Sequence, residues 1–160
     1  MRNKDKTTFI VTTYINNGGI TEKIMTEEEF QKLDPNEVDF HWNEAAGQIV
    51  IHDQNGNPIK YSGSIPGVGK VNQILLTEMM WQPGKLITPR QLCANTKRKS
   101  FSTNNNISSH LTRLRTAFGE KKLLPWYFRV RKHPFAFGWN ADRSWRIIEV
   151  VAENSDGKEE

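Results

Sequence analysis

The segment from residue 104 to residue 119 constrains the fold more than any other part of this chain. Its apolar residues Ile107, Leu111, Leu114 and Phe118 are spaced to share one face of an α-helix, and Gly119 follows where a helix C-cap belongs. This pattern predicts a helix over residues 103 to 118. One face of that helix must be buried, so the rest of the chain has to supply a core against which it packs.

The predicted helix lies in the most basic part of the chain. Residues 95 to 146 contain 12 Lys and Arg and two acids, a net charge of 12 − 2 = +10, whereas residues 1 to 94 contain 9 bases and 11 acids. Such a localised positive field attracts polyanions, and the commonest polyanion for a soluble chain is nucleic acid. A solvated basic face without a partner accounts for the charge alone equally well.

The polar face of the same helix favours the nucleic-acid interpretation because it contains no acid. It consists of Asn105, Ser109, Thr112, Arg113 and Thr116, with His110 and Arg115 flanking the apolar stripe. Asn and Arg can form paired hydrogen bonds with adenine and guanine edges, and Ser and Thr can reach phosphates or bases. An ordinary solvent-facing helix would carry some Glu, so we expect this face to read DNA.

Before this helix the pattern predicts mainly short strands. Two β-rich runs, 8 to 15 and 20 to 25, flank Asn16-Asn17-Gly18-Gly19 and form a hairpin. A capping box from Thr26 to Glu29 then starts a short helix that reaches about Leu33. Three more strands, predicted over residues 38–43, 48–53 and 58–62, form an antiparallel meander, and each is expected to bury one side and leave the other wet.

Helices and a second hairpin complete the predicted order. A wide apolar stripe begins after Gly69 and stops at Pro83-Gly84, and Thr88-Pro89 starts a shorter helix that carries Leu92 and Cys93 inward. After the polar-faced helix, strands over 126–131 and 135–139 flank a tip of Lys132-His133-Pro134. A basic hairpin in this position can contact the backbone or the minor groove beside a major-groove helix.

The chain resembles the OmpR/PhoB-type winged-helix DNA-binding domain over about residues 38 to 140. The segment Asn106-Ile107-Ser108-Ser109-His110-Leu111-Thr112-Arg113-Leu114-Arg115 is similar to the family's third-helix pattern T-V-D-V-H-I-S-R-L-R. Val130-Arg131-Lys132-His133-Pro134-Phe135 is similar to the wing pattern V-R-G-x-G-Y, although Lys132 and Pro134 replace glycines. Gln82-Pro83-Gly84-Lys85-Leu86-Ile87-Thr88 is similar to the link N-P-G-R-V-V-S between the first two helices. The resemblance implies an α+β winged helix-turn-helix with an N-terminal antiparallel meander and a C-terminal β-hairpin wing.

The resemblance also implies contact residues. Ser109 and Arg113 are expected to face base edges, and Asn106, His110 and Arg115 to meet phosphates or sugars. On the wing, Arg131 is expected to reach the minor groove, with Arg129, Lys132 and His133 beside it. Lys97, Arg98 and Lys99 occupy the family's connection between second and third helices, where they can grip phosphate, touch RNA polymerase or remain solvated. The expected function is sequence-specific double-stranded DNA binding by a transcriptional regulator, and the alternative is an interaction module that docks on RNA polymerase or another protein.

The predicted organisation has three parts: a hairpin-helix appendage over residues 1–37, the winged-helix domain over 38–148 and an acidic tail over 149–160. The 37 residues before the meander are too few for the receiver domain that family members usually carry. Either regulation comes from something else, such as a partner chain, or the protein binds DNA constitutively. The appendage is the candidate for homodimer formation or for contact with a separate regulatory chain.

Other functional classes find little support. The stretch from Gly63 to Lys70 fails the phosphate-loop spacing and has Val71 where a Ser or Thr is required. Asp39, His41, His52 and Asp53 suggest a metal or nuclease site only weakly, because a half-buried sheet places such groups on its wet face anyway. Neither a membrane span nor a signal peptide is evident, and the single Cys93 is expected in the core. We therefore expect a cytoplasmic protein that is not an enzyme and needs no cofactor.

Overall fold

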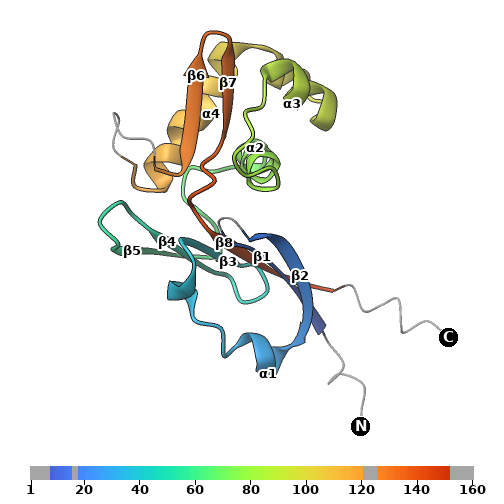
Figure 1. The fold of residues 1–160 in the computed structure, drawn as a ribbon, viewed down its shortest axis with the longest axis vertical. Helices are drawn as coiled ribbons and strands as arrows, with labels where there is room; N and C mark the ends of the chain where they lie inside the picture. Colours follow the sequence, from blue (N-terminus) through green and yellow to red (C-terminus); the bar gives the residue numbers. More distant parts are fainter. Residues whose placement is uncertain (1–7, 16–17, 121–125, 152–160) are drawn as a thin grey trace, which may run out of the picture.

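The computed structural model describes residues 8–15, 18–120 and 126–151, and shows an α+β fold. A mixed six-stranded sheet forms one half of the molecule, and three helices with a two-stranded hairpin form the other (Figure 1). A fourth, short helix lies on the outer side of the sheet. The Asn16-Asn17 turn and residues 152–160 of the acidic tail fall outside the described residues.

The sheet has the strand order β2-β1-β8-β3-β4-β5. Its strands are β1 (Thr8–Ile15), β2 (Gly19–Thr26), β3 (Phe40–Asn43), β4 (Gln48–His52), β5 (Pro58–Ser62) and β8 (Trp145–Val150). Strands β3, β4 and β5 pair antiparallel, which confirms the predicted meander. The pairing of β3 with β8 is parallel, and this pair makes the sheet mixed.

The first hairpin is part of this sheet, so its description as an appendage was wrong. Strand β1 pairs with β8 from Phe9 to Tyr14, and β8 pairs with β3 on its other side. The predicted order ended at residue 139 and contained no eighth strand. The apolar and β-branched run from Trp145 to Val150 was the signal for it. Residues 149 and 150, placed in the tail, belong to this strand.

Both faces of the central strands are buried. The expectation that one side of each strand would face solvent was therefore wrong for these strands. All four residues of β3 are buried: Phe40 and Trp42 join the main core under the helices, whereas His41 and Asn43 point to the opposite face. That outer face is covered by α1 (Glu27–Phe30) and by the chain that follows it, including a 3-10 turn at Pro35–Glu37. The predicted capping box is present, but α1 ends at Phe30, before the expected Leu33.

The predicted helices and the second hairpin are confirmed to within a few residues. They are α2 (Lys70–Met80), α3 (Pro89–Thr96), α4 (Asn104–Ala117), β6 (Phe128–Lys132) and β7 (Phe135–Trp139). The link between α2 and α3 runs along β7, where Ile87 and Phe137 exchange backbone hydrogen bonds of 2.7 and 3.0 Å. Gly138 is required there because a Cβ would collide with the carbonyl oxygen of Lys85. The hairpin is thereby held against the helices.

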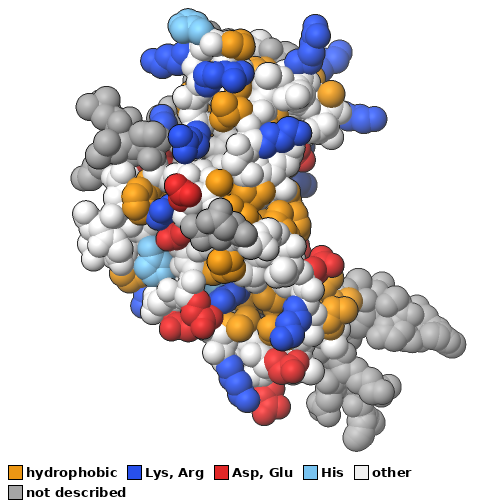
Figure 2. Space-filling model, in the orientation of Figure 1, with side chains coloured by type: hydrophobic (Ala, Val, Ile, Leu, Met, Phe, Trp, Pro, Cys, Tyr) orange, Lys and Arg blue, Asp and Glu red, His pale blue; other side chains and the backbone are white. Residues whose placement is uncertain are grey.

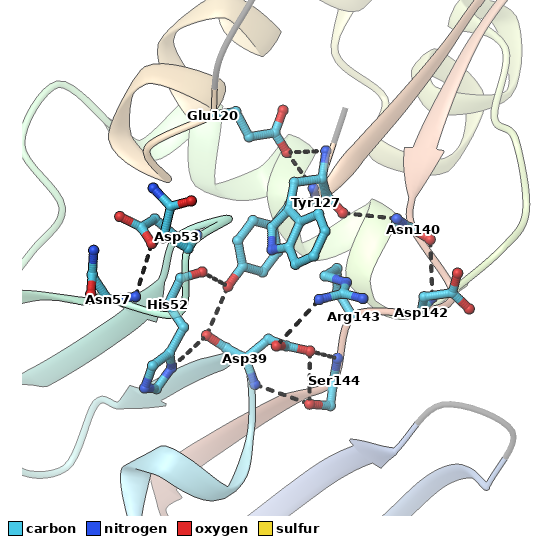
Figure 3. Close-up of polar contacts among 12 residues, drawn as sticks. Asp39, His52, Asp53, Asn57, Glu120, Tyr127, Asn140, Asp142, Arg143 and Ser144 are labelled. Atoms are coloured by element: carbon cyan, nitrogen blue, oxygen red, sulfur yellow. Dashed lines mark hydrogen bonds and ion pairs between the residues drawn. The ribbon is translucent and has the colours of Figure 1, made fainter. Parts of the chain in front are cut away.

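A buried polar network joins the hairpin to the sheet (Figure 3). The Tyr127 hydroxyl donates towards the carbonyl oxygens of His52 and Asp39, at 2.6 and 2.8 Å. The Asp39 carboxylate accepts from the Ser144 backbone N–H at 2.8 Å and lies 3.5 Å from Nη1 of Arg143. These bonds fix the helical half relative to the sheet.

Candidate nucleic-acid interface

The orientation of α4 is set by its buried face. Ile107, Leu111, Leu114 and Phe118 are at most 3% exposed, which confirms the predicted stripe. The ring of Phe118, directly after the helix, lies 4.8 Å from that of Phe40 and 5.1 Å from that of Phe128. Contacts with both the sheet and the hairpin leave α4 no freedom to rotate, so its polar face has a fixed direction.

That polar face is exposed to solvent. Ser109, Thr112, Arg113 and Thr116 have exposed side chains, as predicted from the helical spacing. Asn106, expected at the interface from the family resemblance, is exposed as well. The hydroxyl of Thr112 donates to the Ser108 carbonyl at 2.9 Å, and that of Thr116 donates to the Thr112 carbonyl at 3.0 Å. Since each proton is used within the helix, these hydroxyls can accept hydrogen bonds from base amino groups but have none left to give to phosphate. The Asn105 side chain lies outside the described part of the structure.

His110 and Arg115 occupy the flanks of the helix and contact the protein itself. The half-buried His110 ring packs edge-to-face on Phe101 at 5.9 Å, and burial, followed by the nearby Arg113 charge, lowers the pKa of His110. A neutral ring is a weak partner for phosphate. Arg115 is also half-buried, and its Nε lies 3.3 Å from Oε1 of Glu120. The structure thus gives both residues internal contacts that the sequence did not reveal.

Glu120 is a structural residue missed by sequence analysis. Its side chain is fully buried, and Oε2 accepts hydrogen bonds from the backbone N–H groups of Trp126, Tyr127 and Phe128. Burial raises the pKa of Glu120, although these three donors and Arg115 act in the opposite direction. Its carboxylate ties the end of α4 to the start of β6. An acid directly after the helix-ending Gly119, in a strongly basic segment, was the available signal.

A shallow, mostly apolar groove of about 530 Å³ runs beside the polar face of α4. Tyr61 and Pro66 line its outer wall, and Thr112, Arg113 and Thr116 line the helix side. The Tyr61 hydroxyl donates to the Ala117 carbonyl at 2.8 Å, which ties β5 to the last turn of α4. Arg113 therefore stands at the edge of an apolar surface rather than in open solvent.

The hairpin presents its basic residues at and near its tip. Arg129 and Arg131 alternate with the inward residues Phe128 and Val130, so both point to the same outer face. Nε of Arg131 donates to the Pro134 carbonyl at 3.0 Å, which orients this guanidinium across the turn. Lys132 and His133 are exposed at the tip.

The predicted basic turn links α3 to α4. Lys97 has a left-handed backbone with φ of 60° and ends α3, where its N–H donates to the Cys93 carbonyl at 2.7 Å. The side chains of Lys97 and Lys99 are exposed, whereas Arg98 is half-buried. Cys93, expected in the core, is only half-buried.

Positive charge gathers over the helical half of the molecule. In Figure 2, Lys and Arg side chains cluster at the top, over the part that Figure 1 shows as α3, α4 and the hairpin, while most acids lie lower, over the sheet and α1. Within residues 95–146, the described ion pairs engage Arg115, Arg143 and Arg146. Arg113, Arg129 and Lys132 are exposed and take part in none of these pairs.

The four residues of the suspected metal site have separate roles. His52 is hydrogen-bonded to Asn36 and to the Asp39 carbonyl, Asp53 accepts from the backbone of the following turn, and Asp39 belongs to the network around Tyr127. His41 is buried on the outer face of the sheet. No group of three or more potential metal ligands occurs among the described residues.

None of the described helices is long and apolar enough to cross a membrane.

The structure is that of an α+β protein. It has a mixed six-stranded sheet and a helical half that carries a basic hairpin. Comparison with protein-family models, with curated proteins and with solved structures found no match to this chain.

Proposed function

We propose that this chain is a transcriptional regulator that binds double-stranded DNA sequence-specifically in the manner of a winged helix. In this proposal α4 enters the major groove and the hairpin β6–β7 acts as the wing on the adjacent backbone or minor groove. The observation that carries it is the exposed, acid-free face of α4, whose direction is fixed by Phe118 and the core.

The proposed interface divides into base-reading groups on α4 and phosphate-contacting groups on the hairpin and the 97–99 turn. Arg113 is exposed and takes part in none of the described ion pairs, so its guanidinium is available for guanine O6 and N7. Ser109 and Asn106 lie on the same exposed face, one and two turns earlier. Arg129 and Lys132 on the hairpin, with Lys97 and Lys99, are assigned to phosphates. Arg115 is left out because Glu120 holds it.

Selection from a random double-stranded DNA library at about 150 mM salt tests the proposal, since at that ionic strength sequence-independent phosphate binding is weakened. The wild type should enrich a motif, and Arg113→Ala should alter or lose it. Lys23→Ala is the matched control, because Lys23 is an exposed cation on β2, in the sheet half of the molecule. Absence of any enriched motif, or the same loss with the control, would contradict the assignment.

A second candidate function is an interaction module that docks on RNA polymerase or another protein. The apolar groove between α4 and Tyr61 favours it, because DNA surfaces offer little apolar area to fill such a groove. This candidate expects a saturable complex with purified RNA polymerase that survives nuclease treatment, together with no enrichment of a DNA motif.

A further inference from the structure

The outer face of the sheet, opposite the helices, contains a pocket of about 410 Å³. It lies between α1 and strands β1, β3 and β4, and its size falls within the range of small-molecule sites, roughly 300–1,000 Å³. Phe9, Phe30 and Leu33 supply apolar walls, and His41 and Asn43 supply polar groups from β3. None of these residues belongs to the candidate nucleic-acid interface.

His41 is the unusual member of this lining. Its side chain is 2% exposed, and its Nδ1 is buried without a hydrogen-bond partner in the described structure. Buried polar atoms in folded proteins nearly always have a partner, because an unpaired one keeps its desolvation cost. An apolar side chain would fill this position at a lower desolvation cost. A ligand in the pocket that forms a hydrogen bond with the imidazole would account for a histidine here.

Asn43 adds a second buried polar group, at 5% exposure. Its Oδ1 accepts from the Ala46 backbone N–H at 2.9 Å, which fixes the amide plane within the turn between β3 and β4. That bond uses only the oxygen, so the two N–H groups of Nδ2 are left as donors. The pocket thus combines apolar walls with a donor and an imidazole on its sheet side.

The charges around the pocket select against an ionic occupant. No Lys or Arg is among its described lining residues, so an anion would have no cationic side chain in contact with it. Beside His41 on the paired strand β8, Arg146 is only 5% exposed and is held by the Asp34 carbonyl and the Glu37 carboxylate, at 3.1 and 2.8 Å. Burial and this neighbouring cation lower the pKa of His41 to about 4, so the ring is neutral at pH 7. A cation in the pocket would be repelled by Arg146, and Glu27, the one acid in the described lining, is exposed, so solvent screens its attraction.

We infer that this pocket is a binding site for a small uncharged molecule with an apolar, planar body and an adjacent hydrogen-bond donor and acceptor. The body lies between Phe9, Phe30 and Leu33, and the polar end meets His41 and Asn43. A carboxamide on an aromatic ring has this chemistry. The inference is independent of the proposed DNA binding, since it involves a different face of the molecule.

Three probes of nearly equal shape and different charge test it: benzamide, benzoate and benzamidine. Each is titrated into ¹⁵N-labelled full-length protein and followed by amide chemical shifts. Benzamide should give saturable shifts confined to α1, β3 and the β3–β4 turn, with a Kd on the order of 1 mM, as expected for so small a ligand. The two ions should bind about ten-fold more weakly or worse, because their charge must be desolvated without a partner.

Two variants localise the binding. His41→Phe removes the imidazole and fills part of the pocket, and it should abolish the benzamide shifts. Ala46→Phe is the second variant, because Ala46 is an exposed lining residue whose side chain makes no hydrogen bond; it should block the pocket while leaving the fold intact even if His41→Phe does not fold. Saturable benzamide binding lost in Ala46→Phe supports the site. Absence of shifts at about 10 mM benzamide, ten times the expected Kd, shifts that persist in Ala46→Phe, or equal binding of all three probes would overturn it.

Discussion

Oε1 of Glu120 lies 3.3 Å from Nε of Arg115, while Oε2 of the same carboxylate binds three consecutive backbone N–H groups at the start of β6. One buried carboxylate therefore pairs with the guanidinium of Arg115 on the helix and accepts hydrogen bonds from the backbone before the hairpin. Removing this carboxylate leaves the three backbone N–H groups without an acceptor and the guanidinium without its counter-charge, and both losses are costly in a buried site.

We expect Glu120→Ala to lower the free energy of unfolding by about 2–4 kcal/mol, because it strands a partly buried guanidinium and several backbone donors. Glu120→Gln should cost less, since an amide oxygen still accepts from the backbone. Urea denaturation of both variants measures the difference. Glu28→Ala, an exposed acid on α1, is the control and should change stability by about 0.5 kcal/mol or less. A cost for Glu120→Ala as small as that of the control would contradict the role given to Glu120.

Tyr127→Phe tests the junction between the hairpin and the sheet. It removes only the hydroxyl that donates to the carbonyls of His52 and Asp39, and it should cost about 1–2 kcal/mol of stability by loss of a buried hydrogen bond. Phe128→Tyr would place a hydroxyl in the same aromatic cluster without either carbonyl as a partner, so it should also destabilise. Thermal unfolding of the two variants measures these effects. A Tyr127→Phe variant with unchanged thermal stability would show that the Tyr127 hydrogen bond contributes nothing.

His41 makes stability depend on pH. Its pKa is about 4 in the folded protein, below the ordinary value of 6.5, so between these values the unfolded chain binds a proton that the folded chain does not. Stability should therefore be unaffected by this group above pH 6.5 and should fall as the pH drops, by about 2–3 kcal/mol at pH 4.5. His41→Gln should remove this part of the acid sensitivity. Denaturation curves at pH 7 and 4.5 measure it, and an identical loss in the wild type and the variant would rule out His41 as the cause.

Arg113→Ala and Lys132→Ala should weaken DNA binding in different ways. Arg113→Ala should cost about 1–3 kcal/mol on the selected motif and relax the preference at one base pair. Lys132→Ala should weaken binding to every sequence alike, because a tip lysine reaches phosphate rather than bases. Binding isotherms on the motif and on scrambled DNA separate the two effects. Equal losses on both DNAs for Arg113→Ala would refute its base-reading role.

DNA binding should also depend steeply on salt. If about five to seven phosphates are neutralised, a plot of log K against log salt should have a slope of about −4.5 to −6. The measurement needs only the wild-type protein and one DNA duplex over a range of salt concentrations. A slope near zero would exclude binding through the basic residues of α4, the hairpin and the 97–99 turn.

Local patterns in the sequence predicted the helices, both hairpins and the meander. The apolar stripe from Ile107 to Phe118 correctly predicted which face of α4 is buried, because helical periodicity is a local property that packing did not override. Long-range pairing was not predicted. That β8 lies between β1 and β3 depends on contacts between residues more than 100 positions apart, such as Phe40 with Trp145, and no local pattern specifies them.

The candidate site shows the same division. Exposure of Ser109, Thr112, Arg113 and Thr116 follows from spacing alone, and the structure agrees. The ion pair of Arg115 with Glu120 and the contact of His110 with Phe101 depend on where the chain turns after α4 and before it, which spacing does not determine. The outer pocket was not anticipated, since it arises where α1 covers a sheet face that was expected to be wet.

The position of β8 has a consequence for synthesis. The hairpin β1–β2 and the meander β3–β5 are made first, but within the described sheet they are joined only through β8, which is made last. Until residues 145–150 leave the ribosome, β1 and β3 each present an unpaired edge, and such edges pair readily with other chains. A nascent or truncated chain in which residues 145–150 are not available should therefore consist of two open sheet fragments, and such chains should be the ones that chaperones hold.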